Sequence, residues 1–178
     1  MEESTLHVLF VCTGNICRSP TAERLASAMA DQLQIPSFAA SSAGTRALVG
    51  HPIHHNAVAV LEGLGGSGTG FAARQLTPRI ASSADLVLAM TREHRDVVLE
   101  RAPHKLGQTF TIVEAARLAA EFGAENFTDL ADLRSRLTAT DSFDVPDPIG
   151  QAPEVFAMVG QRIADLLQPI LELCRRSS

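Results

Sequence analysis

Two residues that can do chemistry together, Cys12 and Arg18, lie in the segment Val11–Pro20, which reads V-C-T-G-N-I-C-R-S-P. The segment follows a short apolar run, His7–Val11, and its Ser19-Pro20 pair is typical of a helix start. Backbone N–H groups between a strand and a helix N-terminus can converge on an anion, and an arginine can bind its oxygens in a fork. A cysteine in such a positive field is a nucleophile at neutral pH. The segment therefore predicts covalent phosphate chemistry at Cys12.

The residues between Cys12 and Arg18, with the serine that follows them, predict a cradle for an oxyanion. Backbone N–H groups from Thr13 onward can curl toward one point, and Gly14 permits the unusual backbone angles of such a curl. Ser19 can donate a hydrogen bond to the Cys12 sulfur, which would help the thiolate to leave at the end of the reaction. We expect the phosphate to be bound by Thr13, Gly14, Asn15, Ile16, Cys17 and Ser19.

A thiolate that attacks phosphorus needs an acid to protonate the departing oxygen. The best candidate is Asp147, in the segment Val145–Gly150, which reads V-P-D-P-I-G. The prolines on either side of this aspartate stiffen a loop that can carry an acid over a pocket. Asp141 and Asp144 are alternatives at three-residue spacing.

These residues need a scaffold, and the chain predicts one from alternating strands and helices. Strands are predicted at residues 7–11, 37–43, 85–90 and 109–113. Helices are predicted from residue 19 to the Ile35-Pro36 pair and at 56–64, about 92–100, 114–122, 129–137 and about 153–173, with a kink or restart at Pro169. Strands separated by helices imply an α/β fold with a parallel sheet, whose ligands bind at the carboxyl ends of its strands.

The length, composition and charge of the chain exclude several other classes of protein. The 178 residues suit a single domain, 1–178, and a hydrophobic content of 46% excludes a disordered chain. The net charge of −5 leaves no basic stripe for nucleic acid. No apolar run could span a membrane, and only three cysteines are present, so we expect a protein of the reducing cytoplasm. His51, His54 and His55 have no cysteine nearby, so solvated side chains are expected rather than a zinc site.

The chain resembles the low-molecular-weight protein tyrosine phosphatases in four segments that occur in the family's order. They are the Cys12 loop after the first strand, S-S-A-G-T at 41–45, A-R-Q-L-T at 73–77, and Asp147-Pro148. The resemblance implies a single-domain, three-layer α/β/α fold around a four-stranded parallel sheet, with the phosphatase loop between the first strand and the first helix. It also implies an enzyme that needs neither a metal nor another cofactor.

The resemblance implies a reaction as well, the hydrolysis of phosphotyrosine in a phosphorylated protein or peptide through a cysteinyl-phosphate. Cys12 would be the nucleophile and Arg18 the phosphate ligand. Asp147 would act first as general acid and then as general base. Asn15 and Ser42 would shape the loop through hydrogen bonds.

The walls of the predicted pocket depart from the family pattern, which usually has aromatic residues after S-A-G-T and after Asp-Pro. Leu48 and Ile149 stand there, with Ile16 below. Aliphatic walls still bury a ring but lose about 0.5–1.5 kcal/mol of aromatic pairing per contact, so modest affinity for phosphotyrosine is expected. A phosphoarginine-specific branch of similar proteins tends to have threonine at the position of Ile16. The isoleucine in this chain therefore favours phosphotyrosine as the substrate, with phosphoarginine as the alternative.

Two other functions fit part of the pattern. Arsenate reductases of similar fold reuse a Cys-x5-Arg loop but usually need more downstream cysteines than Cys174 alone. A non-catalytic phosphoprotein-binding module would not need Cys12, Arg18 and Asp147 together. Cys17 is either a small core residue or a partner for Cys12 in a reversible disulfide that protects the nucleophile from over-oxidation.

Overall fold

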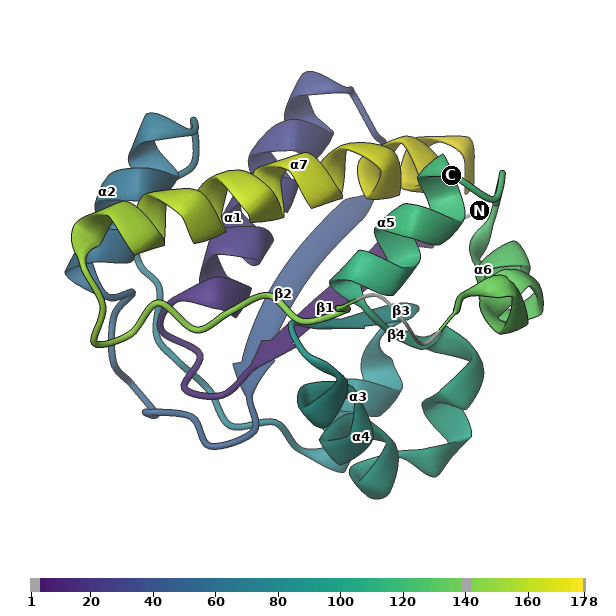
Figure 1. Cartoon of the computed structure of the whole chain (residues 1–178), viewed down its shortest axis with the longest axis horizontal. Helices are drawn as coiled ribbons and strands as arrows, with labels where there is room; N and C mark the ends of the chain where they lie inside the picture. Colours follow the sequence, from purple (N-terminus) through teal and green to yellow (C-terminus); the bar gives the residue numbers. More distant parts are fainter. Residues whose placement is uncertain (1–3, 139–141, 178) are drawn as a thin grey trace.

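The computed structural model describes residues 4–138 and 142–177 and is built around a four-stranded sheet. The strands are β1 (Leu6–Cys12), β2 (Phe38–Gly44), β3 (Leu86–Ala89) and β4 (Thr109–Thr111). Every neighbouring pair is parallel, in the spatial order β2-β1-β3-β4, which confirms the predicted parallel sheet. Because β1 is an interior strand, the segment after Cys12 emerges between the ends of two other strands (Figure 1).

Helices cover both faces of the sheet, which confirms the predicted three-layer arrangement (Figure 1). One face carries α1 (Arg18–Gln32), α2 (His55–Gly63), α5 (Ile112–Ala120) and α7 (Pro153–Ser177). The other face carries α3 (Pro78–Ser83) and α4 (Arg92–Arg101). The shorter elements are α6 (Phe127–Leu133) and the 3-10 segments η1 (Pro103–Gln108) and η2 (Arg134–Arg136). Of the helices in the described ranges, none is both long and apolar enough for a membrane span.

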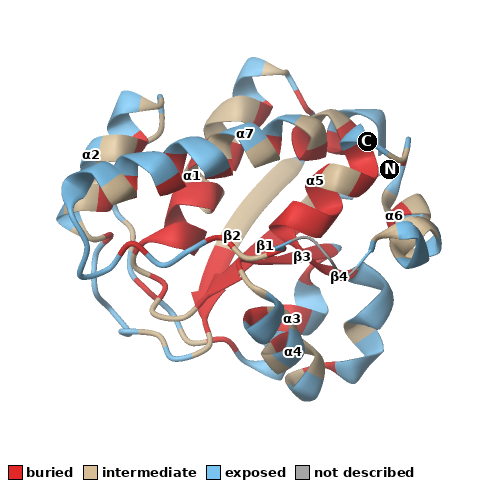
Figure 2. Cartoon of the chain, viewed as in Figure 1, coloured by how far each residue is buried: buried red, intermediate tan, exposed pale blue. Residues whose placement is uncertain are grey.

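Alternation along β1 builds a hydrophobic cluster on each face of the sheet. Val8 and Phe10 belong to the larger cluster with α1, α5 and α7, whereas Leu9 and Val11 belong to the cluster under α3 and α4. Figure 2 shows β3 and much of β1 buried between helices whose outer surfaces are exposed, whereas the edge strand β2 is buried only toward its carboxyl end. By the same alternation the side chain of Cys12 lies on the α1 side of the sheet. The strand therefore delivers the cysteine directly to the start of the first helix.

The structure differs from the predicted elements at several places. The helix predicted at 129–137 is α6 followed by η2, and η1 was not predicted. β4 is shorter than predicted because Thr111 and Glu114 form a capping box that starts α5. The helix α3 was not predicted, although Thr77 caps it and Pro78 occupies its first turn. The last helix does not restart at Pro169, because the residues on either side of it pack against the rest of the core, and a kink there stays a prediction.

Candidate active site

The phosphate loop, residues 12–18, leaves the carboxyl end of β1 and closes at the first residue of α1. It is a succession of bends, and the carbonyl oxygens of its first three residues accept hydrogen bonds of 2.9–3.0 Å from N–H groups of the segment 45–48. The neighbouring strand comes very close, since a Cβ added at Gly44 would lie 2.4 Å from the Thr13 carbonyl oxygen. Glycine at that position is therefore required for β2 to support the loop.

The sulfur of Cys12 lies in a buried hydrogen-bond network. Cys12 is 3% exposed, and its Sγ lies 2.9 Å from the Oγ of Ser19. The side-chain Nδ2 of Asn15 donates to the Oγ atoms of both Ser19 and Ser42, each at 2.9 Å. Because an amide nitrogen only donates, both serine oxygens act as acceptors here and each hydroxyl proton is left for a further partner. The proton of Ser19 is thereby directed to the sulfur of Cys12.

The network continues to two residues that were not predicted, Glu23 and Arg74. Ser42 donates its proton to Glu23 Oε1 at 2.8 Å, and the backbone N–H of Arg74 donates to Asn15 Oδ1 at 2.9 Å. Asn15 is fully buried, with a left-handed φ of 59° that asparagine tolerates better than most residues. The A-R-Q-L-T motif contains Arg74, but no local pattern showed that its backbone meets the loop.

Cys17 occupies the N-cap position of α1, where no side chain caps the helix. Ser19 was predicted to mark the helix start, but its hydroxyl is used by Cys12 and Asn15 instead. Burial raises the pKa of Cys17 to about 12, and the nearby Cys12 is the second cause. Cys17 is therefore a thiol at neutral pH. Cys12, Cys17 and Cys174 are all free, and a Cys12–Cys17 disulfide stays a prediction.

Arg18 joins the loop to the segment that carries the candidate acid. Its side chain is only 5% exposed, and its Nη1 donates to the carbonyl oxygen of Val145 at 2.9 Å. Its Nη2 lies 3.7 Å from Oδ2 of Asp147, whose side chain is 51% exposed. Asp147 Oδ1 also accepts the N–H of Ile149 at 3.1 Å. A buried cation and a solvent-accessible carboxylate thus face each other across the site.

A pocket of about 240 Å³ opens over the loop. Its lining consists of Cys12, Thr13, Gly14, Ile16, Cys17, Arg18, Arg46, Leu48, Asp147 and Ile149. The structure therefore brings the three expected wall residues to the same pocket as the nucleophile, whereas Asn15, Ser19 and Ser42 lie in the network behind it. Arg46, an exposed cation of the lining, was not predicted.

Of the two alternative acids, the structure describes Asp144, which is not among the residues that line this pocket. Asp144 Oδ1 accepts the backbone N–H of Arg92 at 2.9 Å and lies 3.7 Å from Arg92 Nε. Its carboxylate is therefore engaged with α4. Asp141 lies outside the described residues.

His94 contacts the loop and was not predicted. It is 5% exposed, and its Nε2 lies 2.7 Å from Oγ1 of Thr13. Burial lowers the pKa of His94 to about 4, with the positive charge of Arg18 as the second cause, so the imidazole is neutral near pH 7. Since 81 residues separate it from Thr13, no spacing rule could have paired the two.

The histidines near α2 are arranged for packing. His54 stacks on His55 and on Phe156, with ring centroids 4.4 and 4.9 Å apart, and its Nδ1 accepts the N–H of Asn56. Burial lowers the pKa of His54. Among residues 4–138 and 142–177, no three His, Cys, Asp or Glu side chains lie close enough together to hold a metal ion.

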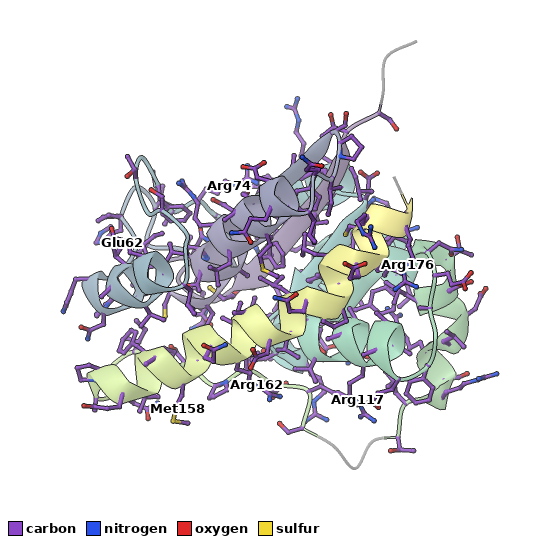
Figure 3. The ribbon with its side chains drawn as sticks, turned by 90° about the horizontal axis from the view of Figure 1, so that it is seen from above. Glu62, Arg74, Arg117, Met158, Arg162 and Arg176 are labelled. Carbon is purple, nitrogen blue, oxygen red and sulfur yellow. The ribbon has the colours of Figure 1, made fainter. Side chains whose placement is uncertain are left out.

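A larger groove of about 600 Å³ lies between α5 and α7. Figure 3 labels Arg117, Met158 and Arg162, which line it. None of its lining residues belongs to the phosphate loop or to the acid segment. The smaller pocket is the candidate active site, because it holds the cysteine, the guanidinium and the carboxylate.

Known proteins are similar to this chain in sequence and in structure. Residues 7–121 match the family described as low molecular weight phosphotyrosine protein phosphatase. The low molecular weight protein-tyrosine-phosphatase Etp of Escherichia coli K12 is 43% identical over 102 residues, which cover 57% of this chain and 66% of that protein. A protein-arginine-phosphatase of Geobacillus stearothermophilus is 31% identical over 165 residues, 93% of either chain. The solved low molecular weight protein tyrosine phosphatase from T. tengcongensis aligns with a TM-score of 0.76 and 31% identity, over 94% of this chain and 99% of that chain. The predicted fold and enzyme class are confirmed, and the chain belongs to the low molecular weight protein tyrosine phosphatase family.

Proposed function

We propose that this enzyme hydrolyses phosphotyrosine in proteins through a phosphorylated Cys12. In the first step the Cys12 thiolate attacks phosphorus, an S–P bond forms, and the P–O bond to the tyrosine ring breaks. Asp147 transfers its proton to the departing phenolate oxygen. In the second step a water attacks phosphorus while Asp147 takes its proton. The S–P bond then breaks, and inorganic phosphate leaves a thiolate behind.

The observation that carries this proposal is the placement of three groups around one small pocket. Ser19 lies 2.9 Å from the Cys12 sulfur, so its hydroxyl can stabilise the thiolate both as nucleophile and as leaving group. Arg18 uses Nη1 for Val145, and its other N–H groups remain for phosphate oxygens. Asp147 stands 3.7 Å from that guanidinium, where a proton can be given to an ester oxygen of a phosphate bound by Arg18.

The walls support an aryl phosphate as the substrate. The nucleophile is 3% exposed, whereas Leu48 and Ile149 are 46% and 41% exposed, so the walls stand between solvent and the sulfur. A tyrosine ring is long enough to pass between two such walls, and aliphatic side chains bury its faces. A phosphoserine has only one carbon between its backbone and the ester oxygen, so it reaches the sulfur less easily.

Phosphoarginine is the second candidate substrate, supported by the similarity to the Geobacillus stearothermophilus protein-arginine-phosphatase. Two lining residues favour tyrosine over arginine. Ile16 offers only hydrocarbon at the loop, and Arg46 places a positive charge in the lining, which disfavours a guanidinium substrate.

A peptide panel tests the proposal. Three peptides of one sequence, with phosphotyrosine, phosphoserine or phosphoarginine, are offered to the wild type, Cys12→Ser and Asp147→Asn at mildly acidic pH. We expect preference for phosphotyrosine, no turnover by Cys12→Ser, and a loss of at least about 100-fold in Asp147→Asn. Turnover by Cys12→Ser would refute the mechanism, and arsenate-dependent thiol oxidation without phosphatase activity would establish the reductase instead.

We further propose that residues 1–178 act as one domain in the cytoplasm, on a phosphorylated protein or peptide. Both hydrophobic clusters pack on one sheet, which supports a single domain. The free thiols of Cys12, Cys17 and Cys174 suit a reducing compartment. Phosphate or another oxyanion is the expected occupant of the loop, and a net charge of −5 favours no nucleic-acid partner.

A further inference from the structure

The segment that carries Asp147 depends on a few individual contacts for its position. Residues 142–152 form neither a helix nor a strand. Two successive residues fasten this segment to residues 90–94, which follow β3 and include the first residues of α4, and which we call the anchor turn. The N–H of Val145 donates to the carbonyl oxygen of Met90 at 2.8 Å, and Asp144 Oδ1 accepts the N–H of Arg92 at 2.9 Å.

The anchor turn is also bound to the phosphate loop. The N–H of Met90 donates to the carbonyl oxygen of Val11, the residue before the nucleophile, at 2.9 Å. His94 Nε2 lies 2.7 Å from Thr13 Oγ1, and the N–H of His94 donates to Thr91 Oγ1 at 3.1 Å, which caps α4. One turn thus holds the nucleophile's loop on one side and the acid's segment on the other.

We propose that Asp144 is a positioning residue for the general acid, and that it acts by fixing the Asp147 segment to the anchor turn. The inference rests on the proposed function, in which Asp147 protonates the leaving group. Arg92 is the first residue of α4, so its N–H has no partner within the helix and a carboxylate is stabilised there. Small displacements of a proton donor slow proton transfer strongly, so this contact is expected to affect the chemistry.

The contact also explains what Asp144 does not do. Its carboxylate faces the N–H and the guanidinium of Arg92 and is absent from the pocket lining. A positioning acceptor does not need an ionisable group, because the Oδ1 of asparagine can accept the same hydrogen bond. A general acid, in contrast, cannot be replaced by asparagine.

The first test compares Asp144→Ala and Asp144→Asn on two substrates. Phenyl phosphate has a poorly departing phenolate that needs protonation, and p-nitrophenyl phosphate has a good leaving group that needs it less. We expect Asp144→Ala to lower kcat/KM by about tenfold on phenyl phosphate and by no more than about twofold on p-nitrophenyl phosphate. Asp144→Asn should restore most of the loss. Equal losses on both substrates, no loss, or an asparagine variant as impaired as the alanine variant would each overturn the proposal.

The second test deletes the donor in place of the acceptor. Arg92→Pro removes the N–H at the first helical position, where proline is well tolerated, and Thr91 already has the extended backbone that proline requires before it. Arg92→Ala removes only the side chain and keeps the N–H. We expect the proline variant alone to reproduce the leaving-group dependence of Asp144→Ala. The same behaviour in both Arg92 variants would assign the effect to the exposed ion pair and overturn the backbone contact.

Two control variants distinguish an effect on the position of Asp147 from a general loss of stability, and Asp147→Asn tests the proposed function separately. Asp85 Oδ2 accepts the N–H of His7 at 2.8 Å at the opposite end of the strands, so Asp85→Ala removes a similar bond away from the site. It should leave the ratio of the two kcat/KM values unchanged. His94→Ala should lower kcat/KM by the same factor on both substrates and weaken inhibition by inorganic phosphate. If Asp147→Asn loses kcat/KM equally on phenyl phosphate and on p-nitrophenyl phosphate, the proposed function fails. If Asp147→Asn loses more on phenyl phosphate but Asp144→Ala does not, only the positioning role fails.

Discussion

Replacing His94 with glutamine should remove a pH dependence of stability that burial imposes on this side chain. The pKa of His94 is lowered from 6.5 to about 4 in the folded chain. The unfolded chain therefore binds this proton more readily, so His94 destabilises the fold as the pH falls from about 6.5 toward about 4 and has little effect above about pH 7. With these two pKa values, the free energy of unfolding falls by about 2.4 kcal/mol between pH 7 and pH 4.5 through this group. Arg18 opposes protonation, whereas Asp144 and Asp147 favour it.

Urea unfolding of the wild type and of His94→Gln, measured from pH 4.5 to pH 7.5, tests this value. Glutamine keeps a polar group that can bond the Thr13 hydroxyl, so the variant isolates the titration. His104→Gln is the matched control, because His104 also contacts a hydroxyl through its Nε2, that of Ser82 at 2.9 Å, but does so at the surface of the protein. We expect the stability gap between wild type and His94→Gln to change by about 2 kcal/mol over this range. Parallel pH profiles for the two proteins would show that the reasoning is wrong.

Three further substitutions, one of them with a matched control, test the loop and the walls. Gly44→Ala should lower the free energy of unfolding by about 2 kcal/mol or more in urea, because the added Cβ would lie 2.4 Å from the Thr13 carbonyl oxygen. Gly63→Ala is the matched control, since a Cβ added there has no atom within 4 Å, and it should stabilise α2 slightly in the same assay. Asn15→Ala removes two buried hydrogen bonds and one partly buried hydrogen bond at a left-handed φ, so urea unfolding should show a loss of about 3 kcal/mol. Weaker inhibition by phosphate should accompany the loss. Unchanged stability would contradict the network. Ile149→Tyr adds an aromatic wall and should lower KM for a phosphotyrosine peptide by about two- to tenfold without helping phosphoserine, and an unchanged KM would place Ile149 outside the substrate's reach.

The phosphate loop and the order of the elements were predictable because their signals are local. An apolar run ends at Cys12, glycine and small polar residues follow it, and a helix start comes next, so the whole feature lies within one short stretch. The predicted end of β4 was wrong although a local signal was present, since Thr111 and Glu114 have the spacing of a capping box and the prediction followed the apolar pattern of 109–113 instead. Local chemistry therefore accounts for the elements and for the nucleophile.

Asn15, Ser19 and Ser42 were predicted to support the loop, but several of the contacts around it could not be, because they form only through the fold. Arg18 bonds Val145 across 127 residues, and Asn15 meets the backbone of Arg74 across 59 residues. The partner of Glu23 is set by the register that places β2 beside β1 and next to α1. A histidine such as His94 has no distinguishing spacing until a crossover places α4 beside the loop. Such pairs depend on tertiary arrangement and are absent from any local pattern.

The most direct measurement of the central claim is the location of phosphate on the enzyme during turnover. Asp147→Asn is mixed with p-nitrophenyl phosphate, whose good leaving group permits the first step, and acid-quenched before its peptides are mapped by mass spectrometry. We expect phosphate on the peptide that contains Cys12, and none when Cys12→Ala, which has no nucleophilic atom at this position, is treated in the same way. Phosphate on a different residue, or turnover by Cys12→Ser, would contradict the claim.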